Sequence, residues 1–155
     1  MSDFHLLLEE EIPRLMRYAS ALTRDADEAG ELVEDTVREA LAEERRCRGD
    51  IHLWLLTRLH DLRGNPFRHV FGTATSVANP KRQLTLSQLD RALGQLPEEQ
   101  RAIILLIGLE GMSYSETAAI LRITLGTMRS RLSHARAALR RAMGVDGAGR
   151  VSHAA

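Results

Sequence analysis

Hydrophobic residues recur at steps of three and four along most of the chain, a pattern that predicts a succession of amphipathic helices. β-branched residues are few, whereas alanine, leucine and arginine dominate, which also favours an all-α fold. Proline and an aspartate with glutamate three residues later are typical helix starts. In the first half the expected helices cover residues 3–11, 13–22, 26–44 and 51–63, with Pro13, Asp25 and Asp50 as start signals.

The second half predicts four more helices. Ser113 and Glu116 form a capping box, which predicts a helix over 114–121, and Thr124 is an N-cap for a longer helix from Leu125. Two earlier helices are marked by the leucines Leu86, Leu89, Leu93 and Leu96 and by the segment from Pro97 to Leu109. The apolar stripe of the last helix consists of Leu125, Met128, Leu132, Ala135 and Leu139.

Between the two halves, residues 72–82 have no apolar period and read as a flexible linker. The expected architecture is therefore two small helical domains on a tether, the second a four-helix helix-turn-helix domain. The expected bounds are 1–71, a linker at 72–84, 85–145, and a disordered tail at 146–155. Whether residues 67–71 continue a helix or form a turn stays open.

The formal net charge is zero, but it is unevenly distributed. Residues 1–63 carry 15 acidic residues and 9 arginines, whereas residues 64–155 carry 6 acidic and 12 basic residues. An acidic half joined to a basic half suggests two partners, with nucleic acid nearer the basic half. Uneven decoration of the surface of a neutral protein gives the same numbers.

Catalytic and metal-binding classes receive no support from the sequence. Cys47 is the single cysteine, no Cys/His cluster has zinc-site spacing, and no nucleophile–base pattern or phosphate loop is visible. We expect no cofactor, no metal and no enzymatic activity. No apolar run has the length of a membrane span, and no signal pattern opens the chain, so we expect a cytoplasmic protein.

The last two helices carry the clearest chemistry. Two short helices joined by a three-residue turn, the second amphipathic and cationic, predict a helix-turn-helix that places its second helix in the DNA major groove. A cationic face is also common on helices that are merely solvated. The small residues Gly126, Thr127 and Ser130 favour DNA, because they allow the helix N-terminus to approach phosphates and base edges.

Three segments of the amino-acid sequence resemble a known protein family. LPEEQRAIILLIGLEGMSYSETAAILRITLGTMRSRLSHARAALRR (96–141) resembles domain 4 of bacterial extracytoplasmic-function (ECF) sigma factors in motif order and spacing. RYASALTRDADEAGELVEDTVREAL (17–41) resembles their domain 2, and WLLTRLHDLRGNPFRH (54–69) resembles their promoter-melting segment. The resemblance implies a factor that binds core RNA polymerase and promoter DNA and directs transcription initiation, with an anti-sigma protein as a further partner.

The resemblance also implies roles for individual residues. Contacts to the clamp helices of the polymerase β′ subunit are expected from Glu31, Leu32, Glu34, Asp35 and Arg38. Contacts to the −35 element are expected from Thr127, Arg129, Ser130, Arg131, His134 and Arg136, with phosphate contacts also from Arg140 and Arg141. Contacts to the −10 element are expected from Arg45, Arg46, Arg48, Arg58, Arg63, Asn65 and Arg68.

Some positions depart from the family pattern. Arg122 occupies a turn position where the family often has glycine, His134 replaces a usual arginine, and Pro66 interrupts the −10 segment. Trp54 lies at core spacing, which favours packing over base stacking. Two alternatives remain at this point: a sigma-like decoy that sequesters an anti-sigma protein, and a dimeric helix-turn-helix regulator that does not replace a sigma factor.

Overall fold

The computed structural model describes residues 3–47, 49–64 and 88–144. It divides into two compact units, residues 1–77 with 118–122 and residues 78–117 with 123–155. Every regular element of the described residues is helical, which confirms the predicted all-α fold. Within the same residues, no helix combines the length and hydropathy that a membrane crossing requires.

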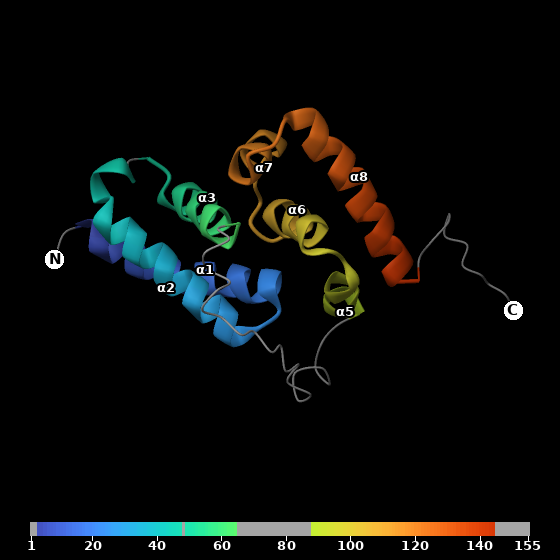
Figure 1. Cartoon of the computed structure of the whole chain (residues 1–155), viewed down its shortest axis with the longest axis horizontal. Coiled ribbons are helices and arrows are strands. Elements are labelled where there is room, and N and C mark those ends of the chain that lie inside the picture. The colour runs from blue at the N-terminus through green and yellow to red at the C-terminus, as the bar shows by residue number, and fades with distance from the viewer. Residues whose placement is uncertain (1–2, 48, 65–87, 145–155) are drawn as a thin grey trace, which may run out of the picture. The chain divides into compact units, whose positions relative to one another are not determined.

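The first unit contains α1 (Asp3–Thr23), α2 (Ala26–Ala42), the short 3-10 helix η1 (Glu44–Arg46) and α3 (Ile51–Arg63). The three α-helices pack against one another in pairs, and Figure 1 shows α1 and α2 side by side. Their shared core is made of fully buried side chains, among them Leu15, Tyr18, Leu22, Leu32, Leu55 and Leu59. Removing such apolar surface from water is the main force that holds these helices together.

The prediction of two helices over residues 3–22 was wrong, because α1 is one helix that continues through Pro13. Proline lacks the N–H that would bond the carbonyl of Glu9. Pro13 is exposed on α1, so water can satisfy that carbonyl. The buried residues Leu8 and Leu15 lie on the core side of the helix on either side of the proline. Continuous packing of this stripe therefore outweighs the break that proline favours.

The predicted caps of the first unit are confirmed. The Asp25 carboxylate accepts hydrogen bonds from the backbone N–H groups of Asp27 and Glu28, at 2.9 and 3.0 Å. The Asp50 carboxylate accepts one from the N–H of Leu53 at 3.1 Å. α2 and α3 therefore begin where the sequence predicts, because the side chains satisfy N–H groups that have no partner inside the helix.

The second unit is built on α8 (Leu125–Ala142), which packs against α6 (Glu98–Gly108) and α5 (Gln88–Gln95). Figure 1 shows α5 beside the C-terminal end of α8. The turn from α5 to α6 is held by the buried Arg101, which donates to the carbonyl oxygens of Leu93 and Leu96 at 2.9 Å each. α7 (Tyr114–Leu121) precedes α8 in the chain.

Several predictions fall on residues outside those described. The linker at 72–84, the residues 67–71 and the tail at 146–155 are among them. The same holds for Arg48, Asn65 and Arg68, three of the residues expected at the −10 element.

Candidate functional site

The last two helices have the capping that their sequence predicts. At the start of α7 the backbone N–H of Glu116 donates to the Ser113 hydroxyl at 3.0 Å. The Glu116 carboxylate in turn accepts from the N–H of Ser113 at 2.9 Å. This reciprocal pair is a complete capping box, which fixes the first turn of the helix.

A three-residue turn, Arg122 to Thr124, joins α7 to α8. Arg122 adopts a left-handed backbone conformation with φ of 55°. Glycine tolerates this region better than any residue with a Cβ atom. Thr124 then caps α8, since its hydroxyl accepts from the N–H of Thr127 at 3.1 Å. The same hydroxyl donates to the Thr127 hydroxyl at 2.9 Å, which fixes both side chains at the tip of α8.

The buried face of α8 is shorter than the apolar stripe in the sequence. Met128, Leu132 and Ala135 are buried as predicted. Leu139 is half-buried, and Leu125 has 37% of its surface exposed. Leu125 therefore belongs to the apolar stripe of the sequence but not to the buried face of α8. Leu125 is the first residue of α8, where the apolar stripe reaches the end of the helix and loses its cover.

The residues expected at DNA lie on the surface of α8. Arg131 is half-exposed, and its guanidinium lies 3.8 Å from the exposed Glu99 carboxylate. An exposed pair at this distance is weak and screened by salt. The Arg136 guanidinium donates to the Tyr114 hydroxyl at 3.4 Å. The exposed members of the set are Thr127, Arg129, Ser130, His134 and Arg136.

α2 presents a mainly acidic surface, which we define as Glu31, Glu34 and Asp35 together with Arg38, the arginine that pairs with two of these acids; it is called the acidic surface below. Arg38 bridges Glu34 at 2.8 Å and Asp35 at 3.0 Å along the helix. Leu32 is fully buried, so it has no surface to offer a partner, and its expected contact with polymerase is not supported. Helical spacing shows which residues lie on one side of a helix, but not which of them remain exposed to solvent in the folded protein.

Leu41 is the apolar residue of α2 that sequence reasoning missed. Leu41 shares helical spacing with the buried residues Val33 and Ala40, yet 46% of its surface is exposed. Positions 34, 38 and 41 follow at steps of four and three, so Leu41 continues the acidic surface toward the C-terminus of α2. The only signal in the sequence was its place at the margin of the stripe.

The arginines expected at the −10 element divide into two groups. Arg45 and Arg46 are exposed in η1. Arg58 on α3 is paired with two acids, Glu39 in α2 and Glu43 directly after α2. Its Nε lies 2.6 Å from a Glu39 oxygen, and one of its terminal nitrogens lies 2.9 Å from a Glu43 oxygen. Arg63 forms an ion pair with Glu28. Both α3 arginines thus join α3 to α2 in this structure.

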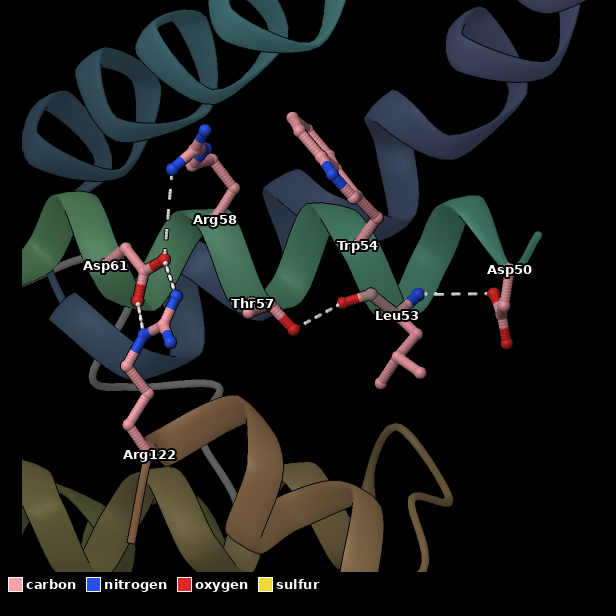
Figure 2. Close-up of a pocket in the computed structure, with 7 residues that line it drawn as sticks. All are labelled: Asp50, Leu53, Trp54, Thr57, Arg58, Asp61 and Arg122. Atoms are coloured by element: carbon pink, nitrogen blue, oxygen red, sulfur yellow. Dashed lines mark hydrogen bonds and ion pairs between the residues drawn. The ribbon is translucent and has the colours of Figure 1, made fainter. Parts of the chain in front are cut away.

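Trp54 is half-buried and does not belong to the core, which corrects the packed position that its spacing favoured. The Arg58 guanidinium lies 5.4 Å from the ring centroid, in cation–π range. Figure 2 shows Trp54 and Arg58 on α3, lining a pocket with Asp61. Hydrogen bonds from Arg122, a residue grouped with the first unit, lower the pKa of Asp61.

Comparison with known proteins agrees with this arrangement. Residues 86–139 match the family described as Sigma-70, region 4, and residues 8–60 match the Sigma2 domain of PhyR. The ECF RNA polymerase sigma factor EcfG of Rhodopseudomonas palustris is 31% identical over 150 residues, which cover 88% of this chain and 83% of that protein. The chain belongs to the ECF RNA polymerase sigma factor family.

Two further comparisons extend over most of this sigma factor. The ECF sigma factor SigL of Mycobacterium tuberculosis is 33% identical over 151 residues, covering 86% of this chain and 85% of SigL. The solved structure of the sigma factor RpoE in complex with the anti-sigma factor NepR, from Bartonella quintana, has a TM-score of 0.75 and 28% identity. It covers 95% of this chain and all of that one. Both helical units of the sigma factor therefore have counterparts in its relatives.

Proposed function

We propose that this sigma factor binds core RNA polymerase through its first unit and reads the −35 element of a promoter with α8. The observation that carries the proposal is the surface of α8. Apart from Leu125 and His134, its exposed residues in the first three turns are small, hydroxylated or cationic, while its opposite side is buried against the rest of the unit. Such a helix can enter the major groove without removing its own core contacts.

Arg129, Arg131 and the hydroxyls of Thr127 and Ser130 are the groups proposed to meet DNA first. Arginine pairs bidentately with the O6 and N7 atoms of guanine, a contact that distinguishes bases. Arg136, Arg140 and Arg141 lie further along α8 and are proposed to meet phosphates, which adds affinity without sequence information. His134, exposed between these groups, is proposed to contact the same groove.

The acidic surface of α2 is the proposed polymerase contact, with Leu41 in place of the buried Leu32 as its apolar anchor. Interfaces combine complementary charge, which steers association, with a few desolvated apolar residues that hold the complex. Glu31 and Glu34 are exposed for such steering, and Leu41 offers apolar area further along the same helix. The proposed partner surface is the basic face of the β′ clamp helices.

The −10 element is proposed to meet the first unit at Arg45 and Arg46, which are exposed. Arg58 and Arg63 would reach phosphates only after releasing the acids Glu39, Glu43 and Glu28. An arginine already paired in this way gains less from a phosphate than an exposed one. Within the described residues of the first unit, opening of promoter DNA is therefore proposed to depend chiefly on η1.

A run-off transcription assay with purified core polymerase tests this proposal. Promoters are first selected from a random DNA pool by the holoenzyme reconstituted with the full chain. The expected result is a transcript that depends on the chain and starts a fixed distance from an asymmetric −35/−10 footprint. A two-fold symmetric footprint that forms without polymerase would instead indicate a dimeric helix-turn-helix regulator.

Two observations favour a second function. Residues 8–60 of the first unit match the Sigma2 domain of PhyR. The two arginines of α3, Arg58 in its middle and Arg63 at its end, are both paired with acids of α2. A chain that presents sigma surfaces to an anti-sigma protein, as in the RpoE–NepR complex, needs no capacity to melt DNA. Such a decoy would bind an anti-sigma protein of this type and release its sigma factor, yet give no run-off transcript.

A further inference from the structure

Leu125 opens the helix proposed to read DNA, and 37% of its surface is exposed. The next two members of its stripe, Met128 and Leu132, are 0% and 4% exposed. A single exposed leucine on a protein surface is ordinary, so exposure alone assigns it no role. Its position is what distinguishes it.

The side chains around Leu125 are small or polar. Thr124 and Thr127 flank it with hydroxyls bonded to each other, and an added Cβ at Gly126 would meet nothing within 4 Å. Met128 is buried, so Leu125 is the one exposed apolar side chain of residues 124–130, all of which the structure describes. The tip of α8 therefore offers a single apolar contact within an open, polar first turn.

This contact has a defined counterpart in DNA. The N-terminal residues of a recognition helix contact base edges in the major groove. Among the four base edges there, thymine alone carries a methyl group, at C5. A leucine side chain neither donates nor accepts hydrogen bonds, so apolar contact is the one kind of base reading open to it.

We propose that Leu125 contacts the C5-methyl group of a thymine in the −35 element and so contributes to promoter choice. The inference rests on the proposed function of α8, but it adds a residue and a base that neither the family resemblance nor the charge of the helix assigns. It also gives a reason for the loss of cover over Leu125, because a fully buried leucine could not reach a base.

The proposal is tested with the reconstituted holoenzyme on its selected promoter. Each thymine of the −35 element, on both strands, is replaced in turn by deoxyuridine, which removes the methyl group alone. For the natural chain we expect one replacement to weaken binding about three- to fivefold, the effect of exposing one methyl group. For Leu125→Ala the same replacement should leave binding unchanged.

Two further variants control the measurement. Leu89→Ala removes a comparably exposed leucine (46%) from α5, and it should retain the full deoxyuridine effect. Leu125→Met keeps an apolar side chain at the site and should retain it as well. Leu125 and Leu89 are both exposed, so neither alanine variant is expected to disturb the core.

The outcomes separate this inference from the function on which it rests. If a promoter is selected but deoxyuridine weakens the natural chain and Leu125→Ala equally at every position, the inference on Leu125 is overturned while −35 reading stands. A selected −35 element with no thymine overturns it in the same way. A holoenzyme that selects no DNA overturns the proposed function and this inference together.

Discussion

Arg131 lies half-exposed in the middle of α8, with a loose contact to Glu99. Replacing it with alanine is expected to reduce promoter binding by the holoenzyme by about 1–3 kcal/mol, the value of one bidentate arginine–guanine contact. Polymerase binding should be unchanged, as measured by co-elution with the core enzyme. Arg91→Ala, an exposed arginine of α5, is the matched control. Loss of both activities in Arg131→Ala would show that the two interfaces were assigned to the wrong units.

The backbone at Arg122 allows a test that separates conformation from side chain. Arg122→Gly and Arg122→Ala both lose the exposed pair with Asp61, but only glycine relieves the left-handed conformation at φ of 55°. The free energy of unfolding of Arg122→Gly is therefore expected to exceed that of Arg122→Ala by about 1 kcal/mol. Thermal unfolding of the two variants measures the difference. Equal stability would mean that the turn does not keep this conformation in solution.

At the scale of elements, the α5–α6 turn depends on one buried arginine. Arg101 satisfies the carbonyls of Leu93 and Leu96, and truncation to alanine would leave two polar groups without this partner. We expect a loss of about 2–3 kcal/mol in the free energy of unfolding, measured with urea. Arg101→Lys should not restore stability, because an ammonium group cannot reproduce the planar fork that reaches both oxygens. Restoration by lysine would contradict this account.

The acidic surface of α2 gives a second test at this scale. Leu41→Arg places a like charge before the basic face of the clamp helices and removes the exposed apolar anchor. We expect polymerase affinity to fall at least tenfold in a competition binding assay, about 1.4 kcal/mol. Leu6→Arg changes a comparably exposed leucine of α1 and should bind normally. If both variants bind alike, Leu41 is not part of the interface.

Secondary structure shows how far local sequence reaches. Local hydrogen bonds determine the helix caps at Asp25, Asp50, Ser113 and Thr124 and the bounds of α3 and α7. The sequence predicts them because donor and acceptor lie only two or three residues apart. At Pro13 the predicted helix break is wrong, because the packing of Leu8 and Leu15 against other helices overrides the local preference for a break.

At the scale of the whole molecule, zero net charge and unequal halves predict how binding depends on salt. Free protein should bind DNA weakly, and its affinity should fall with a log–log slope of about −0.9 for each phosphate neutralised. Arg140→Gln at the exposed end of α8 should reduce that slope by about 0.9 without changing base preference. Filter binding or fluorescence anisotropy between low and physiological salt measures the slope. If Arg140→Gln prefers a different DNA sequence from the natural chain, Arg140 contacts bases and not only phosphates.

The sequence by itself determined the helical fold, the caps, the helix-turn-helix and the family, because these depend on spacing and on residues a few positions apart. Only the tertiary structure decided which members of an apolar stripe are covered. It buried Leu32, left Leu41 and Leu125 exposed, moved Trp54 out of the core and joined Arg58 to the acids Glu39 and Glu43. The reason is physical: exposure depends on which other helices lie over a residue, and that contact joins positions far apart in the chain.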